Sequence, residues 1–235
     1  MRTPRRGSVA TDGASAPRLL IAAPMRVEAL LIRSGTRHAR VRRTGMGPRR
    51  ARAAARALVN EPGDRLLVVG FCGGLDEESE PGEVIVADEL LLDPEALAAG
   101  EADGQERRMC ISAPELARAL SGSGLQVRRG PVVCVSRLVL GKRRRELHEA
   151  GAIAVDMESA WLAAGAGSRP FGVVRVVLDS PGHELLRPAA VLAAVRAGRA
   201  LRRVAGVLGE WGSTTAAPAE QTTPSARLHD GTSTI

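Results

Sequence analysis

Two carboxylates that each follow an apolar stretch are the residues best placed to carry out chemistry. Glu158 comes shortly after the apolar run 152–155, and Asp179 closes the almost wholly apolar run 171–178. In α/β proteins, the carboxyl ends of buried strands border an open crevice in which ligands bind. We therefore expect Glu158 and Asp179 to lie at a ligand site.

A glycine-containing turn, Thr44–Pro48, leads into a predicted helix over 49–58. Pro48 suits the first position of a helix, where its missing N–H costs nothing. The free backbone N–H groups of such a turn can bind an anion. A plain tight turn explains the same residues, and the sequence does not decide between the two interpretations.

Apolar segments alternate with segments of helical periodicity along most of the chain. The pattern predicts strands at 18–23, 37–43, 65–75, 83–92, 126–136, 152–155 and 171–180, and helices at 25–32, 49–58, 114–120, 142–150 and 188–211. A Pro-Gly turn rather than a helix joins 65–75 to 83–92, so the sheet should be mixed. We expect an α/β fold with three layers, α/β/α, around a mixed, twisted central sheet.

The two ends of the chain differ in composition from its middle. Residues 1–17 and 212–235 are rich in Ser, Thr, Gly, Pro and Ala, which predicts a disordered leader and a disordered tail. Residues 18–211 then form one domain.

Charge is unevenly distributed, although the net charge is +7. Residues 18–60 hold eleven Arg and one Glu, whereas residues 61–115 hold fifteen acids and three Arg. This alternation argues against a single basic face for nucleic acid. The scarcity of aromatic residues removes the usual platforms for stacked bases. Frequent Arg and Ala indicate a general composition bias, which weakens any single Arg as a signal. A peripheral membrane contact of the basic segment 142–150 stays open.

Cysteine, histidine and glycine spacings point to no cofactor. Cys72, Cys110 and Cys134 form no CxxC pair, and no HExxH spacing occurs, so we expect no metal site and reduced thiols in a cytoplasmic protein. The glycines of the cluster 70–74 do not follow GxGxxG, and an acidic loop rather than a helix comes next. A dinucleotide site is therefore disfavoured.

Six short motifs occur in one order over about residues 18–210: Ala23–Glu28, Thr44–Pro48, Gly70–Leu75, Pro81–Asp88, Val155–Ala160 and Val174–Asp179. Together they resemble the purine nucleoside phosphorylase and methylthioadenosine/S-adenosylhomocysteine nucleosidase superfamily. Within it, the glycine and arginine patterns are most similar to hopanoid-associated phosphorylase-like proteins, which are implicated in removing adenine from adenosylhopane. The resemblance implies a nucleoside phosphorylase-like fold, a small-molecule nucleoside ligand and a homodimer or higher oligomer.

The resemblance implies that Asp179 is the acid near purine N7. Breaking a ribosyl–purine bond leaves positive charge on the sugar, as in glycoside hydrolysis, and negative charge on the base. Protonating or hydrogen-bonding N7 makes the base a better leaving group. A carboxyl group that donates a proton near neutral pH needs a raised pKa, which an apolar strand end could supply by desolvation. An ordinary turn Asp before Ser180 is the alternative.

Further site residues follow from the same resemblance. Glu158 matches the acid that accepts both ribose hydroxyls, for which the two oxygens of a carboxylate are suited. Met157 would pack on the sugar or base, although a core methionine is nearly as compatible with the sequence. Glu28 matches the acid that activates the attacking water in the nucleosidases.

The resemblance also places backbone and glycine-cluster residues in the site. Leu140 and Gly141 fall where the backbone of the family binds the purine edge. Phe71 and Gly73, in the glycine cluster, are expected among the substrate-binding residues.

Two departures from the family pattern bear on the reaction. Val68 and Phe71 stand where the phosphorylases carry a phosphate-binding arginine and serine, and an apolar pair cannot neutralise a phosphate dianion. Hydrolysis is therefore favoured over phosphorolysis, although Arg26 or Arg49 could still bind phosphate. Leu178 replaces a serine that is usual in the methylthioadenosine enzymes, which suggests a more apolar pocket.

The favoured function is hydrolysis of the N-glycosidic bond of a 5′-modified adenosine, with adenosylhopane as the substrate and adenine as a product. A phosphorolytic purine nucleoside phosphorylase and a methylthioadenosine/S-adenosylhomocysteine nucleosidase are the enzymatic alternatives. A nucleoside-binding regulatory protein of the same fold is the non-enzymatic one.

Overall fold

The computed structural model describes residues 18–98, 106–182 and 190–214, so the predicted leader and residues 215–235 of the predicted tail lie outside the described residues. The strands are β1 (Leu19–Ala23), β2 (Ala39–Arg43), β3 (Arg65–Gly74), β4 (Val84–Leu92), β5 (Arg107–Met109), β6 (Val127–Cys134), β7 (Ala154–Asp156) and β8 (Phe171–Asp179). The helices are α1 (Arg26–Gly35), α2 (Pro48–Leu58), α3 (Pro94–Ala98), α4 (Ala113–Gly122), α5 (Lys142–Glu149), α6 (Ser159–Leu162), the 3-10 turn η1 (Ala163–Ala166) and α7 (Ala190–Thr214).

The strands form one mixed sheet in the order β2-β1-β3-β7-β6-β4-β5, and β8 pairs with both β3 and β4. The pairs β1–β2, β1–β3 and β3–β8 are parallel. Strand β4 is antiparallel to β8, and β7 is antiparallel to β3. Because β8 bridges β3 and β4, the strands β3, β7, β6, β4 and β8 form a closed ring of pairings. The mixed sheet is confirmed, and the ring is a feature that the sequence did not predict.

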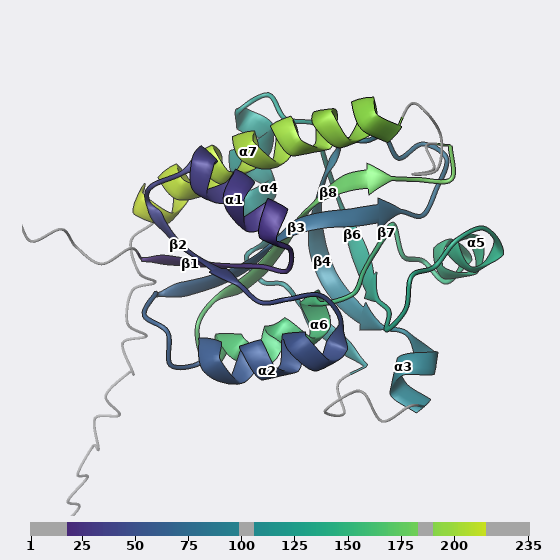
Figure 1. The fold of residues 1–235 in the computed structure, drawn as a ribbon, viewed down its shortest axis with the longest axis horizontal. Coiled ribbons are helices and arrows are strands. Elements are labelled where there is room, and N and C mark those ends of the chain that lie inside the picture. The colour runs from purple at the N-terminus through teal and green to yellow at the C-terminus, as the bar shows by residue number, and fades with distance from the viewer. Residues whose placement is uncertain (1–17, 99–105, 183–189, 215–235) are drawn as a thin grey trace, which may run out of the picture.

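Helices cover the sheet on both sides. In Figure 1, α1, α4 and α7 lie on one side of the strands, and α2 and α6 lie on the other. The three-layer α/β/α prediction is therefore confirmed. The buried core between the layers is built largely from Leu, Val, Ile and Ala, as the scarcity of aromatic residues requires. Within the described residues, no helix has both the length and the apolar character needed to cross a bilayer.

A β-bulge near the end of β8 determines which side chains reach the carboxyl end of the sheet. Val177 of β8 pairs with Cys72, but the next pairing joins Gly73 to Asp179, so Leu178 is an extra residue. In a regular strand, neighbouring side chains point to opposite faces. A bulge interrupts this alternation and re-aims a side chain, which allows Leu178 and Asp179 to line the same cavity.

Helices α1 and α7 pack closely where a glycine ends α1. A Cβ atom added to Gly35 would lie 2.3 Å from the carbonyl oxygen of Arg202 and 2.9 Å from Cβ of Ala205. The absence of a side chain therefore sets the distance between the two helices. Helix α7 itself extends to Thr214, three residues beyond its predicted end.

We predict that Gly35→Ala lowers the free energy of unfolding by about 1–3 kcal/mol, because backbone and a packed alanine would have to move. Gly198→Ala, in the facing helix, is the control, since its added Cβ would meet only Leu31 Cδ1 at 3.6 Å. The control should gain up to about 1 kcal/mol from better helix propensity. Urea unfolding of both variants measures the difference, and equal stabilities would contradict the close packing.

Candidate active site

A cavity of about 270 Å³ opens at the carboxyl ends of β1, β3, β6, β7 and β8. Six of the residues predicted for the site line it: Glu28, Phe71, Gly73, Met157, Glu158 and Asp179. Three acids that are far apart in the sequence therefore share one cavity. This is the crevice in which α/β proteins bind ligands.

Glu28 is buried at the cavity wall, although it lies in the first turn of a surface helix. Its Oε2 accepts a hydrogen bond of 2.6 Å from the N–H of Met25, and its Oε1 accepts one of 2.7 Å from the N–H of Phe71. Burial raises the pKa of Glu28, and the nearby guanidinium of Arg175 opposes this rise. The carboxyl group is thus fixed by two backbone donors and is more basic than an exposed glutamate.

Glycine is required at position 70 for Glu28 to take this place. A Cβ atom at Gly70 would lie 2.5 Å from Glu28 Oε1 and 2.8 Å from Arg175 Nη1. Real Cβ atoms do not approach other atoms so closely, so a side chain here would displace the carboxylate or the guanidinium. The absence of a side chain at Gly70 therefore leaves room for both charged groups.

Glu158 is bound by the turn Thr44–Pro48, for which the sequence left an anion site and a plain tight turn equally open. Its Oε1 accepts a hydrogen bond of 2.9 Å from the N–H of Gly47, the residue that caps the N-terminus of α2. Gly47 has φ of 84°, a left-handed conformation that glycine adopts without strain. The anion at this helix N-terminus is thus a carboxylate of the protein itself. Burial raises the pKa of Glu158 to about 7, opposed by Arg175 and reinforced by Asp156.

A fully buried arginine in β8, Arg175, connects the acids. Its Nη2 lies 2.5 Å from Asp156 Oδ2 and 3.8 Å from Glu158 Oε2, and it donates to Ser159 Oγ at 2.8 Å. Its Nη1 donates to the carbonyl oxygen of Phe71 at 3.4 Å. The guanidinium is therefore shared between the two carboxylates and two neutral acceptors.

Asp156 holds the turn that carries Glu158. Its Oδ1 accepts hydrogen bonds of 3.2 Å from the N–H groups of Glu158 and Ser159, and the hydroxyl of Ser159 donates to Oδ2. The thiol of Cys134 also donates to Oδ1, at 2.9 Å. Although Asp156 is buried, the charge of Arg175 and these donors lower its pKa. Asp156 is therefore an ionised structural group beneath Glu158.

Asp179 is buried, as predicted, but its surroundings are not simply apolar. Nη2 of Arg144, which is also buried, lies 2.5 Å from Asp179 Oδ2. The expectation of an apolar strand end is therefore wrong in this respect, because a side chain from α5 reaches it. A Cβ atom at Gly73 would lie 3.1 Å from Arg144 Nη2 and 3.4 Å from Asp179 Oδ1, so glycine leaves both groups open to the cavity.

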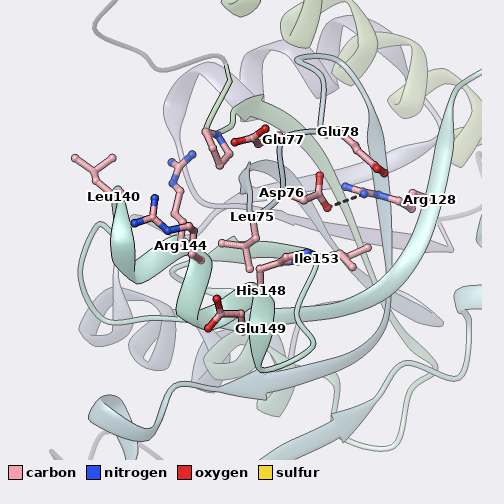
Figure 2. A pocket seen from close by; sticks show the side chains of 13 residues that line it. Leu75, Asp76, Glu77, Glu78, Arg128, Leu140, Arg144, His148, Glu149 and Ile153 are labelled. Carbon is pink, nitrogen blue, oxygen red and sulfur yellow. Dashed lines mark hydrogen bonds and ion pairs between the residues drawn. The ribbon is translucent and has the colours of Figure 1, made fainter.

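Leu140 and Gly141 do not line this cavity; Leu138 and Val139, slightly earlier in the chain, do. Leu140 and Gly141 instead line a neighbouring pocket of about 670 Å³, which we call the outer pocket. Figure 2 shows it, with the acids 76–78 and residues of α5 on its wall. Arg144 lines both cavities and so lies between them.

The sequence interpretation missed Arg175, Arg144 and Asp156. Arg175 was detectable in principle, because a charged residue inside an apolar strand is rarely buried without a partner. It was discounted because arginine is so frequent in this chain. Arg144 gave no such signal, since it stands in a run of four basic residues, 142–145, of a predicted surface helix. Within the described residues, no group of three or more His, Cys, Asp or Glu could hold a metal ion.

Known structures share this fold. A futalosine hydrolase of Helicobacter pylori superposes with a TM-score of 0.65 at 17% identity, covering 81% of this chain and 94% of that one. A 5′-methylthioadenosine/S-adenosylhomocysteine nucleosidase from the same organism gives a TM-score of 0.66 at 16% identity, with 82% and 96% covered. The corresponding nucleosidase from Neisseria meningitidis, in complex with methylthio-immucillin-A, gives 0.65 at 21% identity, with 83% and 100% covered.

At these identities, the structural matches establish the fold alone. Among curated protein sequences, none matches this chain significantly. The model of one protein family, however, matches residues 24–206, which include Glu28, Glu158 and Asp179. With this match over most of its length, the chain belongs to the phosphorylase superfamily.

Proposed function

We propose that this protein hydrolyses the N-glycosidic bond of a 5′-modified adenosine and releases adenine. The favoured substrate is adenosylhopane, which would yield ribosylhopane. One observation carries the proposal: Glu28, Glu158 and Asp179 line a single cavity of about 270 Å³. The similar structures include methylthioadenosine/S-adenosylhomocysteine nucleosidases, which fits the same reaction class. By the family resemblance, we also expect a homo-oligomer.

Glu28 is the proposed general base. Each of its oxygens already accepts one backbone N–H, and each can accept a second hydrogen bond, so a water molecule can be held there. Its raised pKa brings it nearer to the operating pH, where general bases work best. The water oxygen attacks C1′ and Glu28 takes its proton. The bonding pair leaves with the base, which gains a proton from solvent.

Glu158 is the proposed ligand of the ribose diol. Oε1 is held by Gly47, and both oxygens keep lone pairs for hydroxyl donors. Holding the diol orients C1′ toward the attacking water and the leaving base, which lowers the entropy cost of the reaction. Met157 and Phe71, which also line the cavity, supply apolar contacts, and Asp179 faces the N7 edge of the purine.

The charges around the cavity favour water over phosphate. Glu28, Glu158 and the underlying Asp156 outnumber the guanidinium of Arg175, whose contacts are with carboxylates and neutral oxygens. The second arginine at the cavity, Arg144, is paired with a fourth acid, Asp179. A phosphate dianion in this place would face like charges, which costs several kcal/mol in order of magnitude when they are buried. Arg26 and Arg49 are exposed and do not line the cavity.

The lining supports an apolar 5′ substituent. Leu178 and Phe71 form part of the wall, and Met46 and Leu138 line the cavity while 49% and 69% exposed. Exposed apolar side chains at a cavity are suited to a ligand that extends outward. This observation favours a lipidic substituent over the short thioethers of the methylthioadenosine enzymes.

The central experiment measures adenine release from methylthioadenosine, adenosylhomocysteine and adenosylhopane, each with and without phosphate. We expect adenine from at least one substrate, the highest kcat/KM with adenosylhopane, and no stimulation by phosphate. Activity only with phosphate would establish a phosphorylase instead. Binding without any adenine release would support a nucleoside-binding regulatory protein.

We predict that Glu28→Gln lowers kcat by roughly 10²–10⁴-fold, the usual contribution of a general base. Nucleoside affinity should change by less than about tenfold, because the amide keeps one acceptor for a backbone N–H. Single-turnover kinetics and equilibrium binding separate the two quantities. Glu115→Gln, at an exposed position outside the cavity, is the matched control and should behave as wild type. Retained turnover in Glu28→Gln would remove Glu28 from the mechanism.

Nucleoside affinity should rise with pH in the Glu28→Gln background, because only an ionised Glu158 accepts both hydroxyls. The pKa of Glu158 is raised to about 7, so the affinity should fall about tenfold per pH unit below that value and level off above it. Titration calorimetry between about pH 5 and pH 8 measures this. A 2′,3′-dideoxy analogue lacks the diol and should bind with little pH dependence. An equal slope for both ligands would contradict the assignment.

A further inference from the structure

Arg144 differs from its neighbours in the basic helix α5. Its side chain is 3% exposed, whereas that of Lys142 is 83% exposed. Three contacts fix its guanidinium: Nε donates to the carbonyl oxygen of Val139 at 3.1 Å, Nη1 to that of Gly74 at 3.5 Å, and Nη2 to Asp179 at 2.5 Å. Burying a guanidinium costs desolvation free energy. The burial of Arg144 between two cavities therefore suggests that its charge has a function there.

The geometry leaves part of this guanidinium for a ligand. An arginine has five N–H donors, and the three contacts above use three of them. Nη2 carries a second hydrogen that these contacts do not use. This nitrogen lies 3.1 Å from the position that a Cβ atom of Gly73 would occupy, and Gly73 and Arg144 both line the 270 Å³ cavity. Asp179 Oδ1, which does not contact Arg144, lies 3.4 Å from the same position. A donor and an acceptor thus stand side by side at the cavity.

This pair matches one class of purine. A 6-aminopurine presents an acceptor, N7, beside a donor, the 6-amino group, whereas a 6-oxopurine presents two acceptors there. We propose, on the basis of the function proposed above, that Arg144 is a further catalytic residue. Its Nη2 donates a hydrogen bond to N7 of the leaving base, while Asp179 Oδ1 accepts one from the 6-amino group.

The same contact assists the reaction. When the C1′–N9 bond breaks, its electron pair leaves with the base, and negative charge spreads over the ring to N7. A fixed cation in a desolvated site stabilises such charge more in the transition state than in the bound substrate. Arg144 therefore contributes to kcat more than to affinity. The contact also explains how the purine can leave next to Asp179: the guanidinium paired with that carboxylate is the group that stabilises the negative charge on the purine.

The test is a double-mutant cycle between the protein and N7 of the ligand. The affinities of methylthioadenosine and of its 7-deaza analogue are measured in the non-cleaving Glu28→Gln background, with Arg144 intact or changed to Met. With Arg144, loss of N7 should weaken binding about tenfold; in Arg144→Met, both ligands should bind equally. The ratio of the two affinities does not depend on how much of the sample is folded.

Kinetics in the otherwise wild-type protein supply the second arm. Arg144→Met should lower kcat about 100-fold, and Arg144→Lys, which keeps the charge, should recover part of it. Arg145→Met, the next residue of α5, is exposed and lines only the outer pocket, so it should leave kcat unchanged. Wild-type kcat/KM should favour the 6-amino over the 6-oxo form of the substrate by about 10- to 100-fold.

The outcomes separate this inference from the proposed function. If wild-type protein releases adenine but the preference for N7 persists in Arg144→Met, another group contacts N7 and the inference fails. If no substrate is cleaved, the proposed function fails, while the binding cycle still tests the contact. A wild-type preference for the 6-oxo substrate would also overturn the inference.

Discussion

The buried guanidinium of Arg175 is the constraint on which the site depends. It is fully buried in the middle of β8, close to Asp156 and Glu158 and within electrostatic reach of Glu28. Three carboxylates gathered in a small cavity would repel one another and lose their hydration without a compensating cation. A guanidinium can serve several partners at once because its donors point in different directions. The pairing of β8 with both β3 and β4 places it among them.

Backbone N–H groups fix the carboxylates of Glu28 and Glu158 in addition to the ion pairs. The N–H groups of Met25 and Phe71 hold Glu28, and that of Gly47 holds Glu158. Gly70 leaves the space that Glu28 occupies. Glu28 and Glu158 are thus fixed by backbone donors from different parts of the chain, and neither depends on a flexible side chain alone. Fixed polar groups of this kind are what an active site needs to act without reorganising during the reaction.

Much of the fold follows from local patterns in the sequence. The apolar runs predicted the principal strands, and the strand–turn–strand pattern over 65–92 predicted a mixed sheet. The positions of Glu158 and Asp179 at strand ends predicted that they lie near one another. Strand β5 and the ring closed by β8 were not predicted, because pairings between distant segments leave no periodic signal.

The parts of the site that the sequence did not reveal are tertiary contacts. Arg144 and Arg175 look ordinary in a chain so rich in arginine, and only their burial distinguishes them. The offset from Leu140 and Gly141 to Leu138 and Val139 has a similar cause. A family motif locates a loop, but the conformation of that loop decides which of its residues faces the cavity.

The distribution of charge around the cavity matches the charge that glycosidic cleavage creates. Near Arg175, the carboxylates of Glu28, Glu158 and Asp156 outnumber the cation, so this part of the lining favours positive charge on the sugar. Near Asp179 stands the guanidinium of Arg144, the cation proposed above for the departing base. Cleavage separates charge in the same sense, positive on the ribosyl group and negative on the purine. Because both groups are buried, little solvent screens this field. Under the proposed function, the arrangement of two arginines and four acids favours the transition state over the neutral substrate.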